Sequence, residues 1–350
     1  MMNKNQEVQV DFEYGTLKEV IVGIPNIIYP DITKAHWVKE ALNILPEDEA
    51  QKIVANSYKD SKETGQYESM EKENQELISI LQRHNIIIHR PDLVTKERAI
   101  LNFGEDYLRL SGVSQQFTRD PFLVIGNHVI ECSMGSLYRR CDILGLKNLF
   151  IERLIGSNAQ WIAMPSLDYS RMIKGSDFDK TAFPVLEGGD VIVLGKKIFV
   201  GISQNKTTGS SILGYRWLKA YLEPFGYDVQ QISLPETLLH LDVALSIPKR
   251  GVIIVCPEAF PDGVPSYFQD WKQITVTIDQ ARRLAANGLP LDENHYIIGY
   301  NDHFSGTVIL EALEKEGITV YRIPFGNHNA VGGSIRCSTN PLVRVLPHKL

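Results

Sequence analysis

Short runs of β-branched and apolar residues recur along the whole chain, and Gly, Asn or Pro interrupts each of them. This pattern is typical of short strands, which we expect at residues 17–24, 122–132, 191–203, 251–257 and 295–300. Two of the runs contain a turn signal. We therefore expect 122–132 to form a hairpin around Gly126–Asn127 and 191–203 to form one around Gly195–Lys197.

Apolar residues at helical spacing alternate with these strands, at 68–84, 210–225 and 305–317. The last two segments open on a serine and close on a glycine, as helix caps often do. Region 46–66 is polar and lacks hydrophobic periodicity. We expect it to be a helical or loose insertion at the surface.

Four segments of the chain share one plan, in which a helix ends near Gly or His and a short strand then stops at a proline. The four prolines are Pro91, Pro165, Pro235 and Pro324. Recurring units of this kind indicate a radial or stacked architecture, although the same order of elements is common in any α/β protein. No linker-like stretch divides the chain, so we expect one domain over residues 1–350.

The composition excludes several classes of protein. The 350 residues carry a net charge of −6 without a long basic run, which disfavours a nucleic-acid partner. No run of about 18 apolar residues is present, so no membrane span is expected, and the first residues lack the apolar core of a secretion signal. The cysteines are scattered without zinc-ligand spacing. These features favour a cytoplasmic protein without a metal.

Charged and reactive residues stand at several places where the strand pattern predicts burial. His240 and Asp242 interrupt an apolar run two residues apart, so on a strand they would share one face. Burying both is unfavourable unless they are paired or used in chemistry, and a structural pair satisfies this as well as an active-site pair does. The other candidates are Asp120, Arg139, Arg140, Glu187, Asp190, Arg336 and Cys337.

Taken together, these residues fit one kind of chemistry. A thiol nucleophile needs a base and a carboxylate that orients the base, and Cys337, His240 and Glu187 supply these groups. Asp120 and Asp242 would repel a thiolate, so they are useful only if the substrate is a cation. A planar guanidinium, with its donors in a fixed fork, suits two carboxylates.

The motifs "TRDPF", "LEGGD", "HLD" and "GGSIRC", in this order, resemble the guanidine-modifying, or pentein, superfamily. The likeness is greatest to its amidinotransferase and arginine deiminase branch and runs from "LKEVIVG" to "CSTNPLVR". It implies a five-bladed α/β propeller of pseudo-repeated ββαβ units with the active site at the axis. It implies no metal or organic cofactor, and it suggests a homodimer because many relatives are dimers.

The resemblance also implies roles for the candidates. Cys337 would be the nucleophile, His240 the general acid and base, and Glu187 the carboxylate that orients His240. Asp120 and Asp242 would bind the guanidinium of the substrate.

The remaining candidates have less certain parts in the resemblance. Asp190 would be structural or share the role of Glu187, and Arg139 and Arg140 would hold the α-carboxylate of the donor. Arg336 stands where relatives usually have histidine. It would assist thiolate formation or bind an acidic group of the substrate.

The expected activity is an amidinotransferase that moves the amidino group of L-arginine to an amine through an amidino-Cys337 intermediate and releases ornithine. Two alternatives stay open. One is an arginine deiminase that gives citrulline and ammonia, and the other is a non-catalytic binding role, since a ribosome-binding initiation factor shares the propeller. Ala285 and Ala286 stand where glycine amidinotransferase places a serine near its substrate, so the amine acceptor is left open.

Overall fold

The computed structural model describes residues 7–35, 38, 42, 45–135, 139–165 and 180–346. The first six residues, which belong to the segment without an apolar secretion core, lie outside these ranges, as do residues 136–138, which directly precede Arg139. Among the helices within them, none is long and apolar enough to cross a lipid bilayer.

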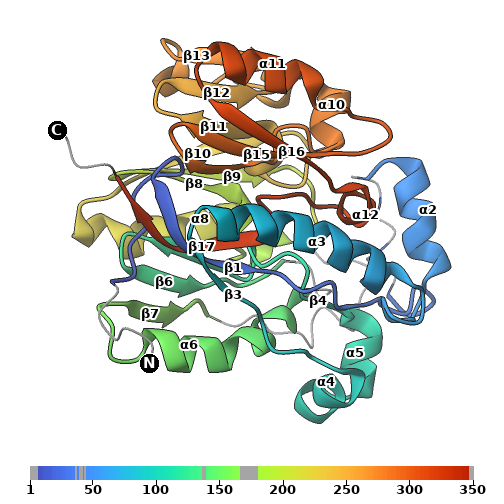
Figure 1. Ribbon diagram of the computed structural model, residues 1–350. Helices are drawn as coiled ribbons and strands as arrows, with labels where there is room; N and C mark the ends of the chain where they lie inside the picture. Colours follow the sequence, from blue (N-terminus) through green and yellow to red (C-terminus); the bar gives the residue numbers. More distant parts are fainter. Residues whose placement is uncertain are drawn as a thin grey trace.

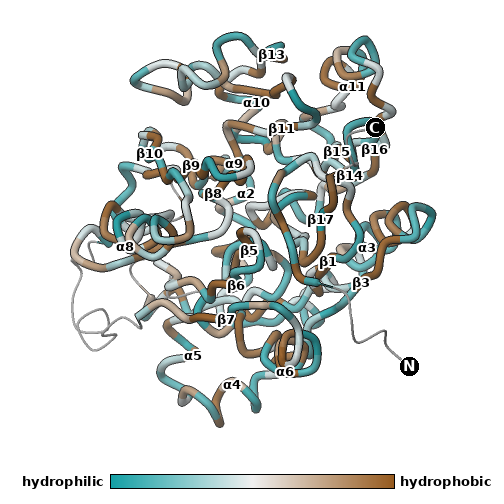
Figure 2. Tube along the Cα trace, turned by 90° about the vertical axis from the view of Figure 1, so that its left-hand side faces the viewer, coloured by the Kyte–Doolittle hydropathy of each residue, from teal (hydrophilic) through white to brown (hydrophobic). Residues whose placement is uncertain are grey.

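Within the described ranges, five three-stranded sheets surround a central axis, which Figure 2 shows nearly end-on. In every sheet the middle strand pairs antiparallel with the inner strand and parallel with the outer one. This is the ββαβ plan, and the fold is the expected five-bladed propeller. The blades, each given from the inner to the outer strand, are β17 (Thr339–Val345), β1 (Thr16–Val22) and β3 (Ile87–His89); β5 (Phe122–Ile125), β6 (His128–Glu131) and β7 (Gln160–Ala163); β8 (Val191–Leu194), β9 (Lys197–Ser203) and β10 (Asp228–Leu234); β11 (Leu245–Lys249), β12 (Val252–Val255) and β13 (Lys272–Thr275); and β14 (Leu289–Asp292), β15 (His295–Tyr300) and β16 (Thr319–Pro324).

The first blade joins the two ends of the chain, because its inner strand is the last strand and its middle strand is the first. The pairing of β17 with β1 closes the ring (Figure 1). A separate pair, β2 (Ile27–Ile28) with β4 (Val113–Ser114), lies outside the blades.

The longer helices, among them α3, α6, α8 and α11, lie on the outside of the ring (Figures 1 and 2). The helices are α2 (Glu47–Ala55), α3 (Gln66–Arg83), α4 (Lys96–Phe103), α5 (Glu105–Ser111), α6 (Lys147–Leu154), α8 (Ile212–Leu222), α9 (Leu241–Ala244), α10 (Ile278–Arg282), α11 (Thr307–Lys315) and α12 (Gly326–Asn329).

Both predicted hairpins are confirmed. Their turn glycines, Gly126 and Gly195, have φ values of 58° and 66°, which only glycine adopts readily.

The predicted helix caps are partly right. The Ser211 hydroxyl accepts a hydrogen bond from the Gly214 amide and begins α8 as expected, whereas α11 is preceded by Gly306 and not by Ser305. The polar region 46–66 contains α2 and a series of turns, in agreement with a helical surface insertion.

The four repeated units of the sequence correspond to the blades that end in β3, β7, β10 and β16. The repeat does not include the blade formed by β11, β12 and β13, because its connection between β12 and β13 contains only short 3₁₀ turns, at Pro257–Ala259 and Ser266–Phe268. The sequence between β12 and β13 therefore has no helical periodicity.

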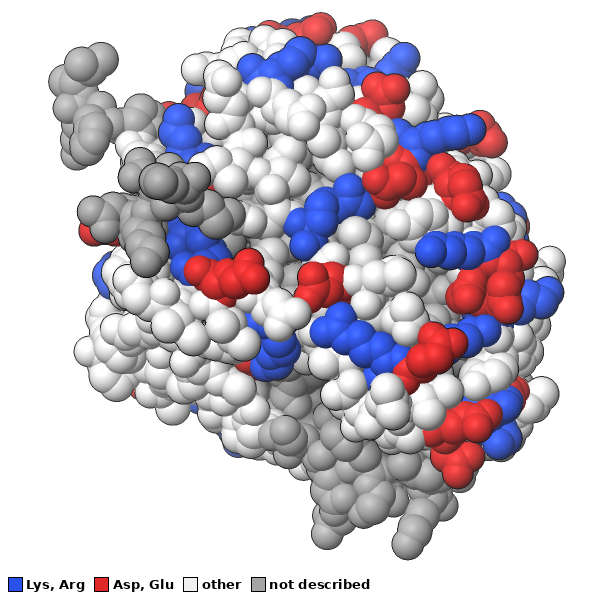
Figure 3. Space-filling model, turned by 60° about the horizontal axis from the view of Figure 1, so that its bottom comes forward, with Lys and Arg blue, Asp and Glu red and all other residues white. Residues whose placement is uncertain are grey.

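On the face shown in Figure 3, basic and acidic side chains of the described residues lie next to one another.

Candidate active site

Cys337 lies just before β17 at the inner end of the first blade, and only 4% of it is exposed. Its backbone N–H donates to Oδ1 of Asn287 at 3.2 Å, and its Sγ lies 3.7 Å from Oδ2 of Asp242. Burial and the negative charges of Asp242 and Asp120 raise the pKa of the thiol. In the protein without substrate, the sulfur therefore holds its proton.

His240 and Glu187 form a buried pair. Nε2 of His240 lies 2.5 Å from Oε2 of Glu187, and Oε1 of Glu187 accepts a hydrogen bond from the Gly135 amide at 2.9 Å. Burial disfavours the imidazolium, but the surrounding carboxylates of Asp120, Asp190 and Glu187 outweigh burial and raise the pKa of His240. The ring is therefore held in one orientation and carries a proton that it can donate.

Asp190 supports the backbone that carries His240. Its Oδ1 accepts a hydrogen bond from the Leu241 amide at 3.0 Å, and its Oδ2 accepts one from the Ser210 amide at 2.7 Å. Glu187 is thus the carboxylate in contact with the imidazole, while both oxygens of Asp190 bind backbone.

One expectation about this segment is wrong, because His240 and Asp242 do not lie on a strand. His240 precedes the helical turn α9, and strand β11 begins only at Leu245. The bond from the Leu241 amide to Asp190 holds the start of this turn, which the apolar pattern of "LLHLDVAL" did not reveal.

Asp120 lies on the other side of the imidazole. Its Oδ1 is 3.7 Å from Nδ1 of His240 and accepts a hydrogen bond from the Gly189 amide at 2.9 Å. A Cβ on Gly189 would come within 2.6 Å of Nδ1 of His240, so this position requires glycine. The second glycine of "LEGGD" thus allows the turn to approach His240 and Asp120.

The guanidinium of Arg139 is held by internal partners. It pairs with Oδ2 of Asp120, donates to Oδ2 of Asp142 at 2.9 Å and binds the Phe117 carbonyl. These contacts favour a positioning role, and the predicted contact of Arg139 with a substrate carboxylate stays a prediction.

Arg140 stays a candidate for the same contact. It is buried, and burial lowers its pKa to about 10 although the negative charge of Glu187 acts in the opposite direction.

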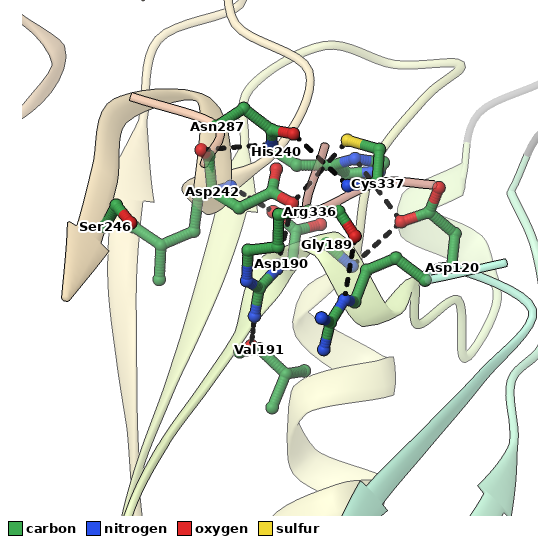
Figure 4. Close-up of polar contacts among 12 residues, drawn as sticks. Asp120, Gly189, Asp190, Val191, His240, Asp242, Ser246, Asn287, Arg336 and Cys337 are labelled. Atoms are coloured by element: carbon green, nitrogen blue, oxygen red, sulfur yellow. Dashed lines mark hydrogen bonds and ion pairs between the residues drawn. The ribbon is translucent and has the colours of Figure 1, made fainter. Parts of the chain in front are cut away.

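Asp242 is fully buried beside Cys337 (Figure 4). Its Oδ2 accepts a hydrogen bond from Nη1 of Arg336 at 2.8 Å, while its Oδ1 has no hydrogen-bond partner among the described residues. Arg336 also donates from Nη2 to Oε1 of Glu13 at 3.0 Å and to the Val191 carbonyl at 2.8 Å. Arg336 is 2% exposed, so it supports Asp242 from within the protein interior.

The geometry brings the thiol, the imidazole and three carboxylates to the inner ends of several blades. A buried carboxylate oxygen without a partner is unfavourable unless a ligand satisfies it, and Oδ1 of Asp242 is such an oxygen next to the sulfur. The arrangement suits a cationic substrate that is attacked by sulfur and receives a proton from His240.

Comparisons with known proteins agree with this geometry. No protein-family model matches the chain. It is 23% identical over 361 residues to glycine amidinotransferase, mitochondrial, of Xenopus tropicalis, a match that covers 93% of this chain and 80% of that protein. It is 24% identical over 352 residues to L-arginine:L-lysine amidinotransferase of Pseudomonas savastanoi pv. phaseolicola, with 93% and 91% covered.

The fold is also similar to that of a solved amidinotransferase structure. SxtG, an amidinotransferase from Microseira wollei, superposes with a TM-score of 0.73 at 22% identity and covers 96% of this chain and 97% of its own. The chain belongs to the guanidine-modifying superfamily. The relatives found over nearly its whole length support amidino transfer as the type of reaction.

Two residues of this guanidine-modifying protein were missed in the sequence. Asn287 joins the backbone of Asp242 to that of Cys337, since its Nδ2 donates to the Asp242 carbonyl at 3.3 Å while its Oδ1 accepts from the Cys337 amide. Glu13 shares Arg336 with Asp242. An arginine beside a buried cysteine requires acidic partners, which could have directed attention to Glu13, whereas no local pattern marks Asn287.

Proposed function

We propose that this protein transfers the amidino group of L-arginine to an amine through a covalent intermediate on Cys337 and releases ornithine. One observation supports this most strongly. The sulfur of Cys337 lies 3.7 Å from a buried aspartate, Asp242, whose second oxygen has no partner among the described residues. A guanidinium bound to that oxygen would place its central carbon next to the sulfur.

Binding of the cation also explains how a thiol with a raised pKa becomes reactive. The carboxylates of Asp242 and Asp120 favour the protonated sulfur. A bound guanidinium neutralises these charges, so the pKa of Cys337 falls and the thiol proton leaves to solvent. The nucleophile then forms only when the donor is present.

In the first half of the reaction, the thiolate of Cys337 attacks the guanidinium carbon. The bond from that carbon to Nε of arginine breaks, and protonated His240 gives its proton to this leaving nitrogen, which becomes the δ-amino group of ornithine. Ornithine is released, and the amidino group with its positive charge remains on sulfur. Glu187 keeps the imidazole in place through the contact of 2.5 Å.

In the second half, a neutral amine attacks the same carbon and His240 takes the proton that the amine loses. The carbon–sulfur bond breaks and regenerates the thiolate of Cys337 and protonated His240. A deiminase would differ in both halves. In the first, the bond from the carbon to a terminal nitrogen breaks, His240 protonates that nitrogen and ammonia leaves, so the ornithine part stays on the carbon bound to sulfur. In the second, water attacks that carbon, His240 takes its proton and citrulline is released.

One assay separates the two outcomes. Incubation with arginine alone, and then with arginine and a panel of amines (glycine, lysine, small diamines, aminocyclitols), should yield ornithine in stoichiometric amounts alone and catalytically with an amine. Mass spectrometry should find one amidino group on the Cys337 peptide and none in Cys337→Ser. Catalytic citrulline from arginine alone would replace the transferase with a hydrolase.

The single domain, the homodimer and the cytoplasmic location that the sequence suggested remain predictions. Size-exclusion chromatography with light scattering tests the homodimer.

A further inference from the structure

A second cluster of ligating side chains lies on the rim of the propeller, apart from Cys337. His84 follows the last turn of α3, Asp292 ends β14 and His295 begins β15. Figure 2 shows α3 beside β14, β15 and β16, and α3 contacts β16 directly. The cluster thus joins the helix of the first blade to the hairpin of the neighbouring blade.

The three side chains are close enough to bind one ion. One ligand atom from each lies within 4.8 Å of the others, and all three residues are half-buried. A tetrahedral zinc ion has bonds of about 2.0–2.2 Å, which corresponds to ligand atoms about 3.4 Å apart. Small rotations of these half-buried side chains would bring the ligand atoms from within 4.8 Å of one another to the spacing of about 3.4 Å that zinc requires.

Neighbouring groups already orient these ligands. The Tyr321 hydroxyl lies 3.0 Å from Nε2 of His84. Two of the proposed ligands, Asp292 and His295, already face each other, with the Asp292 carboxylate 2.9 Å from Nδ1 of His295. The Tyr321 ring also stacks against the ring of His295. Hydrogen bonds that fix imidazole rings are common around metal sites, and the carbonyl end of α3 favours a positive charge near His84.

We propose that His84, Asp292 and His295 bind a divalent transition-metal ion of the zinc class, with water in a fourth position. The ion would link α3 to the β14–β15 hairpin and stabilise the contact between the blades that contain the two ends of the chain. The other explanation is a hydrogen-bonded His–Asp–His cluster without affinity for metals.

The test measures binding of Zn²⁺ by competition with a coloured chelator, in a Cys337→Ser background that removes the active-site thiol. We expect one ion per chain. His84→Gln and Asp292→Asn should each weaken binding at least 10-fold, which is the range for loss of groups at metal sites. His303→Gln serves as the matched control, because His303 lies on a loop outside the cluster and is half exposed.

Thermal unfolding gives a second measurement that is independent of activity. With Zn²⁺ at about 100 times its Kd, the Tm of the Cys337→Ser protein should rise by about 3–5 °C. It should not rise after His84→Gln or Asp292→Asn. Equal affinity in these variants and the His303→Gln control, or no saturable binding at all, would overturn the proposal.

Discussion

The site has two halves, and in each half a buried arginine holds one of the aspartates predicted to bind the substrate. In what we call the nucleophile half, Arg336 pairs with Asp242, next to Cys337. In the proton-transfer half, Arg139 pairs with Asp120, next to His240. Each arginine also pairs with a second carboxylate, Glu13 for Arg336 and Asp142 for Arg139.

The halves differ in what they leave for a substrate. Both oxygens of Asp120 are engaged, one by Arg139 and one by the Gly189 amide, whereas Asp242 keeps one oxygen without a partner among the described residues. The second carboxylates differ as well. Burial acts on both, but Arg336 lowers the pKa of Glu13 below its usual value, while burial raises the pKa of Asp142 to about 7.

The difference indicates that the Arg336–Asp242 pair and the Arg139–Asp120 pair have different functions. Under the proposed function, the nucleophile half offers the open oxygen of Asp242 to the substrate, whereas the aspartate of the proton-transfer half contacts the imidazole and the glycine turn. Variants of corresponding residues in the two halves should therefore behave differently.

The largest effect should come from removing the reactive group of each half. Cys337→Ser and His240→Ala should each lower kcat by about 10⁴-fold or more, because neither sulfur attack nor proton transfer has a substitute. Steady-state assays of ornithine release check this. His240→Ala should still bind arginine, whereas Cys256→Ala, a thiol away from the site, should keep its kcat. A Cys337→Ser protein with near-normal kcat would remove the nucleophile from the proposal.

The next effect concerns stability, and it compares the two arginines. Arg336→Met leaves Glu13 and Asp242 buried without their shared cation and should lower the free energy of unfolding by about 3–5 kcal/mol. Arg139→Met should cost less near neutral pH, because Asp142, with its pKa already raised, takes up a proton readily. Urea unfolding at pH 7 measures both. Equal losses would show that the ionisation of the second carboxylate does not separate the halves.

Donor binding should separate Asp242 from Asp120. Asp242→Asn removes the charge on the open oxygen and should raise the KM for arginine by about 100-fold, as expected for a lost charge-assisted hydrogen bond. Asp120→Asn should raise KM by about 10-fold and lower kcat more, because its contacts are with His240 and Gly189. Near-normal donor binding in Asp242→Asn would contradict the guanidinium assignment.

Most of the fold could be predicted because the repeated helix–strand–proline pattern is local. Four blades follow this pattern, and the fifth does not, since Ser266–Phe268 forms a 3₁₀ turn where the other blades have a helix. The closure of the ring by β17 with β1 depends on contacts between the two ends of the chain. No local periodicity carries that information.

In the candidate site, too, the features that could be predicted have a local signal in the sequence, and the features that could not depend on distant contacts. Cys337, His240 and Glu187 could be proposed as site residues because the chemistry of a thiol, an imidazole and a carboxylate is recognisable. The structure brings His240 and Glu187 into contact, and the catalytic roles of all three stay predictions. The helical turn at His240 could not be predicted, because it depends on the carboxylate of Asp190 about fifty positions earlier. Asn287 was missed for the same reason, since the partners of its side-chain hydrogen bonds are distant in sequence.

The smallest effect we predict is on the thiol itself. Asp242 lies 3.7 Å from the sulfur, and together with burial and Asp120 it raises the pKa of Cys337. Asp242→Asn removes a negative charge, so it should lower this pKa, and Asp120→Asn, the smaller of the two charge contributions, should lower it less. The rate of alkylation by iodoacetamide as a function of pH, followed on the Cys337 peptide, measures the shift: at a fixed pH below the midpoint, Asp242→Asn should react faster. If its midpoint equals that of the unaltered protein, burial alone keeps the proton on sulfur, and the cation would then have to activate the thiol through some contact other than Asp242.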